Sequence, residues 1–166
     1  MVNIAHANLS QAVFTGANLY QADLSDLSLS GATLSQAALN GVDFASSDLS
    51  NANLSGTEMS CLKRVRQTIC TDLSGAYMVD AQFVDADLSG ADLAGANLSG
   101  ADLMGANLSG ANLEGAIFNG ADLAGVNLQK ALYNVRPTQV RNALEGPTAW
   151  PKGYDLKAAP AVCVDC

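Results

Sequence analysis

Basic residues, aromatic residues and long apolar runs are scarce in this sequence, and each scarcity excludes a class of protein. Only 5% of the 166 residues are aromatic, although 49% are hydrophobic, which favours a thin core of Ala and Leu. Lysine and arginine are absent from residues 1–60 and 71–129, and the net charge is −8. Phosphate contacts need clustered cations, so no nucleic-acid partner is expected. No apolar run approaches the ~20 residues that cross a bilayer, so no membrane partner is expected either.

The charges that are present are unevenly distributed. Thirteen acidic residues lie between Asp23 and Asp122. Lys63, Arg64 and Arg66 form a short basic segment in the middle of the chain, and the other five basic residues follow from position 130 onward. The sequence therefore predicts an acidic body with two basic appendages.

A period of five residues dominates the chain. Residues 91–115 read ADLAG ANLSG ADLMG ANLSG ANLEG. With the central apolar residue called position i, position i−2 is usually Ala, i−1 is Asn or Asp, i+1 is often Ser and i+2 is often Gly. There are 24 clear repeats, twelve centred from Ile4 to Met59 and twelve from Leu73 to Leu128.

Neither regular structure accommodates a period of five. In an α-helix five residues advance by a net ~140°, so the Leu column would spiral around the surface. In one long strand an odd period would send successive Leu residues to opposite faces. A short extended stretch with a corner in every repeat puts i−2 and i inside and i−1 outside. Thirteen of the fifteen glycines occupy i+2, where a type II turn needs a positive φ, and Asn or Asp often replaces them.

The tandem A-(D/N)-L-x-x pattern resembles the pentapeptide-repeat family, especially its cyanobacterial members, over residues 2 to about 131. This resemblance implies an all-β solenoid, a right-handed quadrilateral β-helix of about six coils with four repeats in each. We expect residues 1–135 to form this β-helix, interrupted by an inserted loop at 62–70. Residues 136–166 are expected to form a C-terminal cap and tail, with a short α-helix over 137–145 and Trp150 and Tyr154 packed nearby.

The inserted loop begins and ends at cysteines. Removing residues 62–70 restores the five-residue frame, so the chain should leave and re-enter at one corner. Cys61 and Cys70 are then expected within the ~4.4–6.8 Å Cα window of a disulfide, and we predict that they bridge. Two reduced thiols are the alternative.

A second cysteine pair, Cys163 and Cys166, forms CVDC at the end of the chain. A local disulfide, pairing with a partner and a frayed terminus without a role all remain open for this pair. Zinc binding by all four cysteines is disfavoured, because the spacing between Cys61 and Cys70 is poor for a metal site. No metal and no cofactor is therefore expected.

Two outward-facing groups are further interaction candidates. If repeats four apart stack, the i−1 position of one face carries four successive carboxylates, Asp23, Asp43, Asp72 and Asp92. This column would bind cations or a basic partner, or be an ordinary solvated face. Tyr77 and Ile117 replace polar residues at i−1, near Val79 and Val84, and make a small apolar patch. The patch is expected to seat the inserted loop or to bind a partner.

The residues indicate no enzyme. His6 is the single histidine, and the serines occupy repeat positions without a base beside them. We expect a non-enzymatic structural or protein-interaction module with an unidentified protein partner. The resemblance implies one alternative, a DNA-mimic inhibitor of a type II topoisomerase. Another is a redox-sensitive binding module switched through the Cys61–Cys70 loop.

Location and assembly are predicted from the chain's start and its cysteines. No signal peptide is present, but the repeats begin directly after Met1, which suggests that a targeting segment was removed. Together with the paired cysteines this favours the periplasm or the thylakoid lumen, with the cytoplasm as the alternative. Because Val2 and Ile4 lack a cap, the chain is expected to be a monomer or an end-to-end dimer through its N-terminal coil.

Overall fold

Every described repeat except the one centred on Met59 turns a corner at positions i+1 and i+2. The computed structural model describes residues 7–133 and 162–163. The residue at i+2 has a positive φ in every described turn. In all of these turns but the one centred on Leu24, the N–H of i+3 donates to the carbonyl of i, as from Ala32 to Leu29 at 2.9 Å. The expected type II turns are therefore present. Nine corners use a residue other than Gly, namely Gln11, Gln21, Asp26, Gln36, Ser46, Asn51, Asp80, Asp85 and Lys130.

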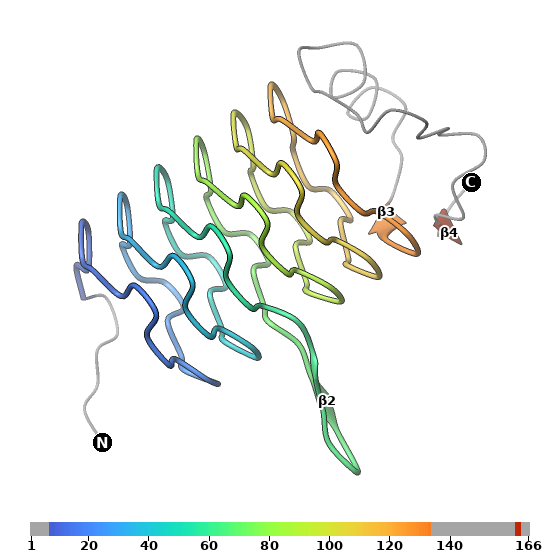
Figure 1. Cartoon of the computed structure of the whole chain (residues 1–166), viewed down its shortest axis with the longest axis horizontal. Helices are drawn as coiled ribbons and strands as arrows, with labels where there is room; N and C mark the ends of the chain where they lie inside the picture. Colours follow the sequence, from blue (N-terminus) through green and yellow to red (C-terminus); the bar gives the residue numbers. More distant parts are fainter. Residues whose placement is uncertain (1–6, 134–161, 164–166) are drawn as a thin grey trace.

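Repeats four apart stack through parallel backbone hydrogen bonds (Figure 1). Thr33, for example, donates its N–H to Ala12 at 2.9 Å and accepts from Phe14 at 2.7 Å. The pairing at i−1 joins residues 20 apart, or 29 apart across the insert, as in Asp43 and Asp72. One turn of four repeats is called a layer here. The i−1 columns define face A (Asp23, Asp43, Asp72, Asp92, Asn112, Leu132), face B (Asn8, Ser28, Asp48, Tyr77, Asn97, Ile117), face C (Val13, Thr33, Asn53, Gln82, Asp102, Asp122) and face D (Asn18, Ala38, Glu58, Asp87, Asn107, Asn127).

The core is a stack of i side chains lined by small residues at i−2. Phe44, Phe83 and the leucines between Leu29 and Leu108 at position i have no exposed surface. The i−2 positions are mostly buried Ala, since little space remains beside the stacked large side chains. These side chains fill the axis of the described β-helix, so the candidate sites considered below are on its outer surface.

Of the four short strands, only β3 continues the repeat pattern, since its Leu132 pairs with Asn112 on face A. β1 (Leu62–Lys63) and β2 (Thr68–Ile69) form an antiparallel hairpin that projects from the side of the β-helix (Figure 1). β3 (Leu132–Tyr133) pairs in parallel with β4 (Val162–Cys163), a pairing that the sequence did not predict. Within the described ranges, no helix is long and apolar enough to cross a membrane.

Several expectations concern parts of the chain outside the described residues. These are the helix over 137–145, the packing of Trp150 and Tyr154, the uncapped Val2 and Ile4, and the pairing of Cys163 and Cys166. They remain predictions.

Candidate interaction surface

The insert is a β-hairpin rather than an irregular loop. Leu62 pairs with Ile69 and Lys63 with Thr68. Arg64 and Gln67 exchange backbone hydrogen bonds of 2.8 and 3.4 Å, which leaves a two-residue turn at Val65 and Arg66. Val65 is 102% exposed, so an apolar side chain stands at the tip in full contact with solvent.

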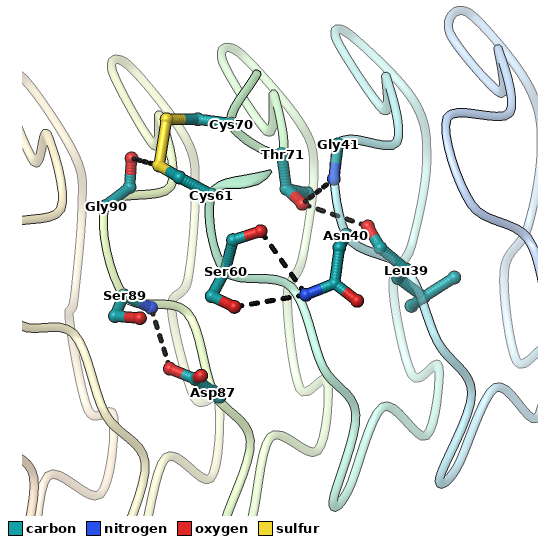
Figure 2. The surroundings of a disulfide bond; sticks show 10 residues. All are labelled: Leu39, Asn40, Gly41, Ser60, Cys61, Cys70, Thr71, Asp87, Ser89 and Gly90. Atoms are coloured by element: carbon teal, nitrogen blue, oxygen red, sulfur yellow. Dashed lines mark hydrogen bonds between the residues drawn. A yellow bond between two sulfur atoms is a disulfide. The ribbon is translucent and has the colours of Figure 1, made fainter. Parts of the chain in front are cut away.

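The base of the hairpin is closed by the predicted disulfide between Cys61 and Cys70 (Figure 2). Their Cα atoms lie 3.9 Å apart, closer than the expected window. The reason is the hairpin register, because directly opposed residues alternate between hydrogen-bonded and closer non-hydrogen-bonded pairs. Arg64 with Gln67 is a hydrogen-bonded pair, so the cysteines, three positions along, occupy a non-hydrogen-bonded pair. With their sulfurs bonded to each other, these two cysteines are not zinc ligands.

One side of the hairpin rests on the corner of Gly41. A Cβ added to Gly41 would lie 3.1 Å from Ile69 Cγ2 and 3.3 Å from Leu62 Cδ1. Further out, the Arg64 guanidinium donates to Gln21 Oε1 at 2.8 Å. The other side faces Gly90, whose carbonyl oxygen lies 3.2 Å from Cys61 Sγ. This is a close contact rather than a hydrogen bond, since a disulfide sulfur carries no hydrogen.

The expectation that the hairpin is seated on the Tyr77 and Ile117 patch is therefore wrong. Tyr77 and Ile117 lie on face B, whereas the hairpin leaves from the corner between faces D and A. Asn97 separates the two residues in their column, so they do not touch as a continuous patch. Tyr77 is 51% exposed and remains available to a partner.

Side chains replace the backbone ladder where the chain leaves the β-helix (Figure 2). At other corners the i+2 N–H donates to a carbonyl of the next layer, as from Gly31 to Ser50 at 2.8 Å. At Gly41 the acceptor is instead the hydroxyl of Thr71, at 3.0 Å, and that hydroxyl donates to Leu39 O at 2.9 Å. Asn40 Nδ2 donates to Ser60 Oγ at 3.0 Å. This network fixes the corner from which the hairpin projects.

The hairpin carries all the cations of the described chain except Lys130. Lys63, Arg64 and Arg66 are exposed and form no ion pair with any described residue. The thirteen carboxylates of the body lie on the faces and corners of the β-helix. A fixed, unpaired cationic element on an acidic body is suited to bind a negatively charged protein surface.

The predicted carboxylate column is present on face A, where Asp23, Asp43, Asp72 and Asp92 stack in successive layers. Each Oδ1 accepts the backbone N–H of the residue two positions on, at 2.9 to 3.2 Å. In Asp23 the Ser25 hydroxyl, followed by the Ser25 N–H, holds the carboxyl pKa below its usual value. No group of three potential metal ligands forms among the described residues.

The same hydrogen bond recurs at every Asn and Asp in the described i−1 positions. The outward position of i−1, which the five-residue period predicts, does not by itself reveal this bond. The structure shows that their short side chains satisfy the i+1 N–H, which no other layer uses. The residues are Asn8, Asn18, Asp23, Asp43, Asp48, Asn53, Asp72, Asp87, Asp92, Asn97, Asp102, Asn107, Asn112, Asp122 and Asn127.

Comparison with known proteins agrees with this architecture. The sequence pattern described as pentapeptide repeats matches eight copies, over residues 2–26, 28–60, 69–105 and 101–131. A trypsin-treated form of QnrB1, a plasmid-mediated fluoroquinolone resistance protein, is similar at 26% identity and a TM-score of 0.51, over 75% of this chain and 52% of that one. The present chain thus spans about half of that structure.

Two pentapeptide repeat proteins are also similar. Rfr23 from the cyanobacterium Cyanothece 51142 is 28% identical, with a TM-score of 0.35, over 74% of this chain and 91% of that one. A protein of the Arabidopsis thaliana thylakoid lumen is 26% identical, with a TM-score of 0.39, over 86% and 79%. No curated protein matches the sequence.

Proposed function

Because this chain belongs to the pentapeptide-repeat family, whose members fold as right-handed quadrilateral β-helices, we propose that it is a non-enzymatic protein-interaction module. The hairpin of residues 62–69 is its binding element. The observation that carries the proposal is a set of three unpaired cations on a hairpin that is held at its base and along one side. A recognition element that is already ordered loses little conformational entropy on binding.

The charges of the molecule favour an acidic protein partner. Such a surface is attracted to the hairpin and repelled by the carboxylates elsewhere, which restricts the encounter to one orientation. An extended polyanion such as a nucleic acid would be repelled by the acidic body wherever it approaches the carboxylates to within the screening length, about 8 Å at physiological salt. Val65 at the tip adds an apolar contact that a partner would cover.

Charge reversal tests the role of the hairpin without disturbing its seat. The doubly reversed variant Lys63→Glu/Arg66→Glu leaves Arg64 on Gln21. Lys130→Glu is the matched control, since it reverses the remaining described cation on the body. In affinity capture from an extract of the source organism, a specific partner should be retained by the wild type and the control and lost by the double variant. Equal capture by all three proteins would refute the hairpin as binding element.

A second candidate is inhibition of a type II topoisomerase by DNA mimicry. It is supported by the four stacked carboxylates of face A and by the fold-level similarity to a fluoroquinolone resistance protein. The basic hairpin opposes it, because three cations interrupt the anionic surface. A DNA gyrase supercoiling assay decides, since the absence of inhibition at micromolar protein removes this candidate.

A disulfide at the hairpin base supports two further proposals. The protein works in an oxidising compartment, the periplasm or the thylakoid lumen, where such bonds persist. Reduction then loosens the hairpin and lowers partner affinity. Thiol titration of the native protein tests both, since free thiols at Cys61 and Cys70 in freshly isolated protein would contradict them.

A further inference from the structure

The N-terminal end of the β-helix has an open β-edge. Neither the backbone N–H nor the C=O of Asn8, Val13 or Asn18 forms a hydrogen bond within the described chain. One layer further in, Thr33 uses both of its groups, on Ala12 and Phe14. Three of the four faces therefore end in unpaired backbone groups, which is the arrangement that recruits another strand.

The core is also incompletely covered at this end. Leu9, Phe14 and Leu19 in the first layer are only partly buried. Their successors in the second layer, Leu29, Leu34 and Leu39, have no exposed surface. Val13, at the edge of face C, is 75% exposed, and a β-branched residue favours strand pairing.

The opposite end is better covered, although the N–H groups of Leu123 and Leu128 on faces C and D form no hydrogen bond within the described chain and Phe118 is only partly buried. β4 pairs with β3 on face A, and Leu123 and Leu128 of the last layer are 2% and 7% exposed. Lys130 occupies a corner there, and a lysine at an edge is a common device against edge-to-edge association. Residues 7–26 contain neither Lys nor Pro, so the described N-terminal edge lacks these two protections.

We propose that the N-terminal end binds a second copy of this chain, end to end, about a two-fold axis. The free groups of Val13 belong to one residue, and an antiparallel hydrogen-bonded pair uses both groups of each partner. With the axis through face C, Val13 meets Val13 of the second copy, and Asn8 on face B meets Asn18 on face D. A second copy satisfies several edges together, whereas a single extended peptide satisfies one.

Electrostatics favour this end for contact between two acidic rods. Faces B, C and D carry no charge in the first two layers, whose outward residues are Asn8, Val13, Asn18, Ser28, Thr33 and Ala38. Two chains of net charge −8 still repel at long range, and salt screens that repulsion. Dimerisation should therefore strengthen with ionic strength. The dimer would carry two hairpins, which would raise the avidity for a partner with two sites.

Sedimentation equilibrium tests the proposal over a range of protein and salt concentrations. The full chain is used with Cys163→Ser and Cys166→Ser, so that tail cysteines cannot link two copies. Val13→Lys places like charges opposite each other across the axis and should weaken the dimer about tenfold or more. Gln82→Lys, at an exposed position of face C in the fourth layer, is the matched control and should leave the dimer unchanged.

Val13→Pro separates edge pairing from misfolding. It removes an N–H that has no partner in the described monomer, and proline is tolerated on an edge strand. The melting curve of the monomer should stay the same while the dimer weakens. A wild type that remains monomeric throughout, or a dimer unaffected by Val13→Lys, overturns the proposal. Lys63→Glu/Arg66→Glu should leave the dimer intact. The dimer proposal and the proposed hairpin function can therefore fail independently of each other.

Discussion

Thr71→Ala should destabilise the protein, although it installs the residue most common at i−2. Thr71 is completely buried at the corner where the hairpin leaves the β-helix. Its hydroxyl accepts the Gly41 N–H at 3.0 Å and donates to Leu39 O at 2.9 Å. Alanine removes the acceptor, and no backbone carbonyl takes its place, because the chain turns away into the hairpin at Cys61.

The size of this destabilisation follows from the groups that Thr71→Ala leaves without a partner. A buried N–H without an acceptor costs about 1–3 kcal/mol. The lost γ-methyl group adds about 0.8 kcal/mol of transfer free energy. Thr71→Ala should therefore lower the free energy of unfolding by roughly 2–4 kcal/mol.

Thr57→Ala is the control for this prediction. Thr57 is also at i−2, is 1% exposed and donates to Leu54 O at 2.7 Å. The control loses the same atoms, but the Gly56 N–H keeps its bond to Val84 O at 2.8 Å. Only the orphaned amide distinguishes the two variants, so Thr71→Ala should cost about 1–3 kcal/mol more.

Two measurements check the comparison. Urea unfolding followed by circular dichroism gives the free-energy difference between the variants. Native-state hydrogen exchange reports on the amide itself, and the Gly41 N–H should exchange faster in Thr71→Ala but not in Thr57→Ala. Equal destabilisation together with unchanged exchange at Gly41 would refute the assigned role of the Thr71 hydroxyl.

Three further predictions concern the hairpin and face A. Cys61→Ser opens a ten-residue loop and should lower stability by about 2–3 kcal/mol, measured by urea unfolding against the oxidised wild type. Gly41→Ala and Gly110→Ala share the strain of a positive φ, but only the former meets the hairpin. Gly41→Ala should therefore speed tryptic cleavage in the hairpin, and Gly110→Ala should not. Since its native pKa is depressed, Asp23 contributes stability that is present above its unfolded pKa near 3.8 and lost as pH falls through the native value. An Asp23 carboxyl that titrates at or above 3.8 by NMR would contradict this.

The repeat made most of the fold predictable, because one five-residue rule applies to every layer. Steric arguments on i, i−2 and i+2 are local and need no knowledge of distant contacts. The disulfide was predictable for the same reason, since the frame places Cys61 and Cys70 at one corner. The Thr71 network was not, because the hydroxyl matters only once the carbonyl expected at that corner has moved away. The one visible sign was a polar residue at i−2 directly after the insert.

The seat of the hairpin could have been derived from the frame. Counting 20 residues back from Cys61 gives Gly41, and the corresponding corner of the next layer is Gly90. The seat on Tyr77 was predicted from residue type, because Tyr77 is an apolar exception at i−1. Residue type alone does not reveal the corner at which an insert leaves the β-helix. The pairing of β4 with β3 could not be predicted, because the two residues of β4 lie outside the five-residue repeat and so have no register in it.

The glycines beside the insert do more than permit a turn. A Cβ on Gly90 would lie 2.5 Å from Cys61 Sγ, so the disulfide occupies space that only glycine leaves open. Gly41 provides the corresponding space for Leu62 and Ile69 on the other side. An insert in this fold thus needs small residues in the layers before and after it, as well as an exposed corner. Gly95 meets the same condition, because Gly75 and Gly115 flank it in its corner column and nothing lies within 4 Å of its added Cβ. A disulfide-closed hairpin transplanted to Gly95 should therefore fold, whereas one placed between layers with larger corner side chains should displace them.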